Sequence, residues 1–339
     1  VAEIATEDMP FLVDSALAAI TLSGRSVRRL LHPILAVRRG ADGEVVSIGP
    51  AMSGGPNESL MRIEIAPHGS GRGAPADWPA VEAALRGALA EVRLAVGDFA
   101  PMLERLRAAE AEVAGAPEGE EAAAFLRWLA EDNFVLLGHR LLRIPAEGGA
   151  IAAEEGLGLL RDPAVVPFDA LRNLSAVPAA VRHSLTEAAA LTVAKGNLRM
   201  RVHRPSHADV VATRILAPDG SVAGIRLFMG LFAATAYNRN PRGIPWLKSK
   251  VARILAASGA APESHDARAF QSILDTWPRD ELFQASEAEI LAGARRALDL
   301  TIRPRPALVV RRDAFGRYVS AIAWFPREVF DTRLRERVA

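Results

Sequence analysis

The sequence contains no cysteine, few lysines and no long apolar run. Without cysteine the chain cannot build disulfide frameworks, thiolate zinc sites or iron–sulfur clusters, and it has no cysteine nucleophile. No segment approaches the roughly 18 apolar residues of a membrane-spanning helix. The N terminus also lacks the basic and apolar regions of a signal peptide. We therefore expect a cytoplasmic protein with no membrane partner.

Positive and negative charges are nearly equal in number: 41 Lys and Arg residues and 40 Asp and Glu residues give a net charge of +1. This balance gives no electrostatic reason to bind nucleic acid. Signatures of catalysis are missing too: there is no G-x-G-x-x-G after a strand, no phosphate-binding loop ending in Gly-Lys-Ser/Thr, no H-E-x-x-H and no G-x-S-x-G. We expect no catalytic residue, metal or cofactor in this segment.

What the sequence does have is length and apolar content, with 339 residues of which 50% are hydrophobic. This is enough for two or three domains, each with its own core. Three stretches share a strand, tight turn and strand pattern: 35–48, 211–225 and 308–322. Asp42-Gly43 and Asp219-Gly220 predict type I′ turns, and the third copy keeps only the glycine of Phe315-Gly316.

The order of the predicted elements indicates an α+β fold of repeated modules, with antiparallel sheets, helices on one face and helical segments between them. We place a first α+β domain at 1–114 and a helical linker at 115–133. A second α+β domain follows at 134–240, with its strands at 134–144, 198–203, 207–216 and 222–232. A helical segment then covers 241–302, and 303–339 begins a third α+β domain.

Two groups of residues are candidates for effector binding. The first group lies where the first predicted strand meets the first predicted helix and consists of Asp8, Pro10, Phe11 and Asp14. A purely structural interpretation is also open, in which Asp8 caps the helix and Pro10 stands in its first turn.

Arg199, Arg201 and His203 form the second group, because they alternate with apolar residues and would share one face of a strand. That face is either an anion site or an ordinary solvated sheet face. His203 and His207 have metal-like spacing, but Pro205 between them prevents helical geometry, so we expect no metal there.

Seven strings along the whole chain resemble the large NAD-dependent glutamate dehydrogenases of bacteria: EDMPFLVDS (7–15), HPILAVRR (32–39), RWLAEDNFVLLGHR (127–140), GLGLLR (156–161), VHRPSHADVV (202–211), PRDELFQ (278–284) and VRRDAFGRYVS (310–320). In that family the polypeptide is several times longer, and its catalytic domain lies far C-terminal to the matched region. The resemblance implies an N-terminal regulatory arm of tandem ACT-like and PAS-like modules. By this resemblance the domain at 1–114 is ACT-like, the domain at 134–240 is PAS-like or ACT-like, and 303–339 begins a third ACT-like domain.

The resemblance also implies a function. The full-length enzyme would oxidise L-glutamate to 2-oxoglutarate and ammonia with NAD, whereas this segment would be a non-catalytic, allosteric and assembly part of a homo-oligomer. Its partners would be its own catalytic domain, other subunits and an amino-acid effector. ACT modules that bind amino acids commonly have glycine after Asp-x-Pro, where this sequence has Phe11. The alternatives are a purely structural oligomerisation module without a ligand and an independent enzyme, for which no constellation of titratable residues is evident.

Overall fold

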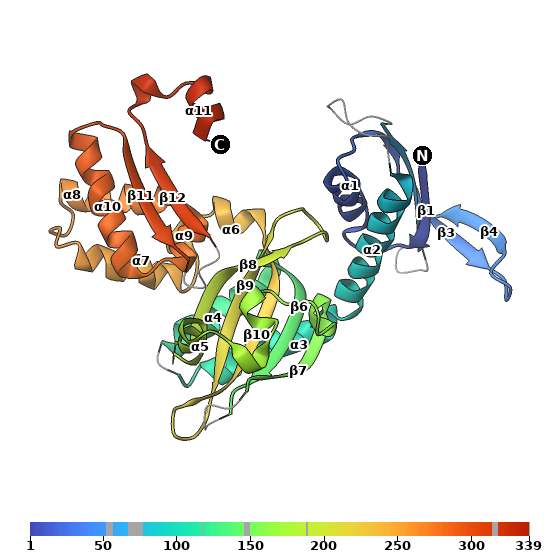
Figure 1. The fold of residues 1–339 in the computed structure, drawn as a ribbon, viewed down its shortest axis with the longest axis horizontal. Helices are drawn as coiled ribbons and strands as arrows, with labels where there is room; N and C mark the ends of the chain where they lie inside the picture. Colours follow the sequence, from blue (N-terminus) through green and yellow to red (C-terminus); the bar gives the residue numbers. More distant parts are fainter. Residues whose placement is uncertain are drawn as a thin grey trace.

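The computed structural model describes residues 1–51, 57–66, 77–116, 118–145, 150–187, 189–313 and 318–338. Three antiparallel sheets follow one another along the chain and are connected through helices (Figure 1). This arrangement confirms the α+β fold class. The Phe315-Gly316 turn lies outside the described residues.

The first sheet is built around its longest strand, β5, which pairs with β1 on one side and with β2 and β3 on the other. The helices α1 and α2 pack together on one face and bury Ile20, Ile63 and Val92. The β3–β4 hairpin projects from this sheet (Figure 1). The elements are β1 (Ala2–Glu7), α1 (Leu12–Leu22), β2 (Val27–Leu31), β3 (Ile34–Arg39), β4 (Val45–Pro50), β5 (Asn57–Ile65) and α2 (Trp78–Gly97).

The hairpin turns at Gly43 and Gly220 are real, but the predicted turn type is wrong. The two glycines have φ angles of 81° and 83°, whereas neither Asp42 nor Asp219 has a positive φ. Gly43 N donates to Gly40 O, and Gly40 N donates to Glu44 O, which describes a type I turn closed by a left-handed glycine. Aspartate therefore avoids the left-handed conformation that a type I′ turn would impose on it.

The second sheet has the strand order β7-β6-β10-β9-β8, and its inner strands β6, β10 and β9 are buried on both faces. Leu227 and Met229 of β10 face a core shared with α1 and α2, while Phe228 between them faces a core shared with the helical segment. Burial of both faces explains why these strands are apolar without strict alternation. The elements are α3 (Phe99–Val113), α4 (Gly119–Trp128), η1 (Leu129–Asn133), β6 (Phe134–Arg143), β7 (Ala152–Gly158), α5 (Ala179–Thr186), β8 (Leu191–Arg199), β9 (His207–Leu216), β10 (Val222–Phe232) and α6 (Ala234–Asn238).

Two features of this region differ from the sequence-based expectation. The predicted strand 198–203 is wrong, because β8 ends at Arg199 and His203 has a φ of 69°, outside the strand conformation. Helix α3, which we expected in the unit 1–114, packs on β6, β7 and β9. Its buried residues Met102 and Leu106 belong to the same core as Phe228, so by packing α3 belongs with the second sheet.

The last part of the chain places four helices beside a third hairpin. Ser286 and Glu289 form a capping box that fixes the start of α10. No helix in the described part of the chain is long and apolar enough to span a bilayer, and no three described acidic or histidine side chains gather as metal ligands would. The elements are α7 (Leu247–Ala257), α8 (His265–Thr276), α9 (Arg279–Gln284), α10 (Glu287–Ile302), β11 (Ala307–Arg312), β12 (Val319–Trp324) and α11 (Thr332–Val338).

Candidate functional sites at the module junctions

The segment between β1 and α1 differs from the expected capped helix. Helix α1 begins at Leu12 with Phe11 in the N-cap position and no side-chain cap, so Asp8 does not cap it and Pro10 precedes it. The Asp8 backbone N–H instead donates to Asn57 O at 2.9 Å, which continues the β1–β5 ladder. The structural interpretation of Asp8 and Pro10 as helix-start residues is therefore wrong.

Phe11 adopts a left-handed backbone conformation with a φ of 71°. This conformation favours glycine and costs an aromatic residue on the order of 1–3 kcal/mol. Its ring lies against the ring of His203, with the centroids 5.4 Å apart. The aromatic side chain thus occupies the turn where ligand-binding relatives were expected to have glycine, and it packs on the second module.

The second predicted group does not form a polar face on one strand, because only Arg199 lies within β8. Arg201 makes a two-pronged ion pair with Glu91 of α2. His203 Nδ1 lies 3.3 Å from Asp14 Oδ2, and its backbone N–H donates to Ser15 Oγ at 3.1 Å. We call these contacts of the β8–β9 loop with α1 and α2 the first junction (Figure 1). Phe11 and Asp14 of the first predicted group thus meet His203 of the second, and these contacts join two modules.

The ion pair of the first junction is expected to contribute little to stability. The Arg201 and Glu91 side chains are 42% and 26% exposed, and solvent screens pairs of this kind. We expect Arg201→Ala to lower the free energy of unfolding by roughly 0.5–1 kcal/mol. The control Arg199→Ala, at an exposed strand end, should change it by less than about 0.5 kcal/mol. Urea denaturation of both variants measures the difference, and equal losses would contradict the assignment.

A second, more deeply buried junction surrounds α9. Lys195 Nζ of β8 donates to Asp209 Oδ1 at 2.6 Å and lies 3.4 Å from Asp280 Oδ2 of α9. Burial alone would lower the pKa of Lys195, but the two carboxylates outweigh it and raise the pKa. Asp209 Oδ2 also accepts from the Phe232 backbone N–H at 3.1 Å. This lysine is therefore charged and connects the second sheet to α9.

The remaining side chains of α9 reach other elements. Tyr237 OH of α6 donates to Asp280 Oδ1 at 3.1 Å. Glu281 accepts two hydrogen bonds of 2.8 Å from Arg311 of β11. Phe283 stacks on Phe232 at the end of β10 with 4.6 Å between ring centroids. One short helix thus binds the second sheet, the helical segment and the third hairpin, and we call this the second junction.

Lys250 of α7 also belongs to the second junction. Its Nζ donates to Ala285 O at 2.6 Å, just past the end of α9. The side chain is 6% exposed, and burial lowers the pKa of Lys250 to about 8. A cation against the last carbonyls of a helix stabilises that helix end.

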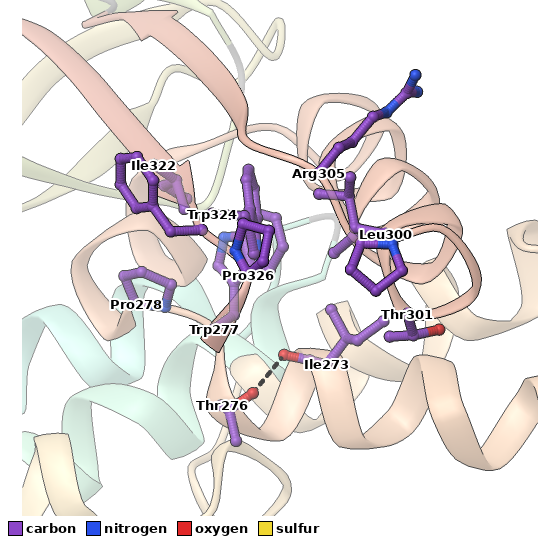
Figure 2. A pocket seen from close by; sticks show the side chains of 13 residues that line it. Ile273, Thr276, Trp277, Pro278, Leu300, Thr301, Arg305, Ile322, Trp324 and Pro326 are labelled. Carbon is purple, nitrogen blue, oxygen red and sulfur yellow. Dashed lines mark hydrogen bonds between the residues drawn. The ribbon is translucent and has the colours of Figure 1, made fainter. Parts of the chain in front are cut away.

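Figure 2 shows a cavity of about 410 Å³ beside the second junction, between α8, α10 and β12. Trp277 and Trp324 form its wall, with ring centroids 6.0 Å apart, and three prolines border it. The hydroxyl of Thr276 donates to Ile273 O and is therefore satisfied within its own helix (Figure 2). The lining is largely apolar, with Thr301 and Arg305 as its other polar side chains.

Sequence reasoning singled out part of the first junction but not Glu91 or Ser15, and it missed the residues of the second junction as a site. Lys195 and Asp209 are distant in sequence from Asp280 and Glu281, and no spacing rule connects the two pairs. The available signal was indirect: Asp209 lies in the string 202–211, and Asp280 and Glu281 lie in the string 278–284, both of which carry the family resemblance.

Comparisons with known proteins identify the modules. Models of glutamate dehydrogenase domains match three parts of the chain: the ACT1 domain at residues 1–74, helical motif 1 at 244–303 and the ACT2 domain at 307–339. The second junction therefore joins the second sheet to helical motif 1 and ACT2.

Similar full-length proteins carry the same family name. The NAD-specific glutamate dehydrogenases of Halomonas elongata and Pseudomonas aeruginosa are 33% and 34% identical over 98% and 99% of this chain. That of Mycobacterium tuberculosis is 28% identical over 98% of the chain. The chain spans only about a fifth of the length of these relatives, 20–21%. By its ACT1, ACT2 and helical-motif matches, the chain belongs to the family of large NAD-specific glutamate dehydrogenases and represents their N-terminal part.

Proposed function

We propose that this chain is the non-catalytic regulatory and assembly segment of an NAD-dependent glutamate dehydrogenase. In this proposal the longer polypeptide oxidises L-glutamate to 2-oxoglutarate and ammonia in the cytoplasm and binds NAD in its own catalytic domain. The ACT1 and ACT2 matches and the names of the relatives support it.

The observation that carries the proposal is the second junction. Asp280 and Glu281 are neighbours on one helix, yet one contacts Lys195 of the second sheet and the other contacts Arg311 of the ACT2 hairpin. A shift of either module must therefore move α9 and act on the other. A shared element with two arrangements is what allosteric coupling requires.

Amino-acid sensing is the finer part of the proposal. Pro10 and Phe11 line a cavity at the first junction, and Asp14 and His203 contact each other beside it. An effector that binds one arrangement of this junction more tightly would shift the population toward that arrangement. Arg199, outside the ion pair, remains a candidate contact for an anionic group.

The test is a thermal-shift screen of the purified chain against L-amino acids, 2-oxoglutarate and NAD, together with an assay of NADH formation from L-glutamate and NAD. We expect no NADH formation and a saturable shift with at least one amino acid, because a ligand that binds only the folded state stabilises it. NADH formation would contradict the non-catalytic assignment. A flat screen would contradict sensing.

A purely structural oligomerisation module is the second candidate, and exposed apolar side chains favour it. Val45 and Ile48 of β4 are 48% and 60% exposed, and Leu308 and Val310 of β11 are 53% and 55% exposed. Clusters of this kind often mark protein contacts. A defined oligomer by light scattering, combined with a flat ligand screen, would favour this function over sensing.

A further inference from the structure

A second cavity, of about 350 Å³, lies between the first module and the second sheet. Phe11 and Val96 form its wall on the side of the first module, and Leu103 of α3, Leu129 of η1 and Leu136 of β6 form the opposite side. We call it the junction cavity. Its volume is within the range of small-ligand sites, roughly 300–1,000 Å³.

Asp132 is the one charged residue among those that line the junction cavity. Its carboxylate is exposed and has no ion-pair or hydrogen-bond partner within the described ranges. The residue has a φ of 59° inside η1, and Asn133 Nδ2 fixes this turn by donating to Trp128 O and Glu131 O at 2.9 Å each. The Asp132 carboxylate is therefore held at the edge of the apolar junction cavity.

We propose that the junction cavity binds a small organic cation, with a branched apolar body in the cavity and its ammonium group at Asp132. Charge complementarity selects a cation, because the lining offers an unpaired carboxylate and no basic side chain. The apolar walls select a body of side-chain size.

The position of the cavity gives binding a consequence for the modules. The ring of Phe11, which lines the cavity, also contacts His203 of the first junction at 5.4 Å between centroids. A ligand would therefore contact both modules at once and stabilise their present arrangement. This regulatory consequence rests on the proposed function, whereas the binding itself does not.

Isothermal titration of the 339-residue chain tests the site with isopentylamine and isocaproate, which share a branched apolar body and differ in the sign of their charge. We expect saturable binding of the amine and binding of the acid at least about tenfold weaker. Asp132→Asn should weaken binding of the amine about tenfold, since asparagine tolerates the left-handed conformation but removes the charge and replaces one acceptor oxygen by an NH2 donor. The matched control is Asp42→Asn, at an exposed turn, which should leave the affinity unchanged.

Leu103→Trp, which fills the cavity, should abolish binding of the amine, with circular dichroism confirming that the variant is folded. Absence of saturable binding, equal affinity for the acid and the amine, or an unchanged affinity in Asp132→Asn would each overturn the site. A different result would contradict the regulatory role in the proposed function. If the amine binds as expected but hydrogen exchange in residues 200–206 does not slow, the site stands and its regulatory role is contradicted.

Discussion

Replacing Glu281 by glutamine is expected to lower the free energy of unfolding by about 3–5 kcal/mol, the largest loss among the ion pairs that the structure describes. The Arg311 and Glu281 side chains are only 8% and 11% exposed and share two hydrogen bonds. The substitution leaves the Arg311 guanidinium buried without its counter-charge. Urea denaturation at neutral pH measures the loss.

The matched control for this pair removes both charges. The double variant Glu281→Met, Arg311→Met should recover most of the stability, because a buried ion pair replaced by apolar side chains of similar volume is often neutral. Burial alone would raise the pKa of Glu281, but the hydrogen bonds from Arg311 outweigh it and lower the pKa. The stability from the pair is therefore full above the ordinary glutamate pKa and lost as the pH falls through the lowered value. A loss below about 1 kcal/mol in Glu281→Gln would show that the pair behaves as a surface contact.

Acid should destabilise the chain through His139, at the centre of the second sheet. The side chain is fully buried, and burial lowers the pKa of His139 from 6.5 to about 4, with Arg226 acting in the same direction. The unfolded chain therefore binds a proton at a higher pH than the folded chain does. Through this residue we expect the free energy of unfolding to fall by about 3 kcal/mol as the pH falls from 6.5 to about 4.

The variant His139→Leu isolates this contribution from that of the carboxylates. Its unfolding free energy should fall less steeply than that of the unmodified chain over the same pH window. The control is His207→Leu on β9, where the side chain is exposed and the pH profile should not change. Parallel profiles for His139→Leu and the unmodified chain would contradict the buried, neutral histidine.

Sequence patterns predicted the elements whose conformation depends on turn residues and on burial of neighbouring side chains. The glycines of the hairpins and the apolar runs of β6, β9 and β10 are visible because turn chemistry and burial leave a direct pattern. Strand β7, with Glu154 and Glu155 at its centre, shows no such pattern and was missed. It is held by its pairing with β6, which no short window of sequence reveals.

The candidate sites depended even more on distant contacts. The alternation from Arg199 to His203 predicted one polar strand face, but pairing with Glu91 and Asp14 draws these residues across to the first module. The string 278–284 carries the family resemblance, but no spacing rule predicted which residues it contacts. Its neighbours Asp280 and Glu281 contact Lys195 and Arg311, which only the folded chain brings to this segment.

The measurement that tests the coupling through α9 most directly is hydrogen exchange of the 339-residue chain carrying Asp280→Asn. Asp280 contacts Lys195 and Tyr237 on the side of the second sheet. If α9 couples the modules, exchange should quicken in β11 and β12 as well as in β8, although the ion pair and hydrogen bond described for Asp280 are with Lys195 and Tyr237 and not with these two strands. Faster exchange confined to β8 and α6 would contradict the coupling and leave α9 as a simple packing element.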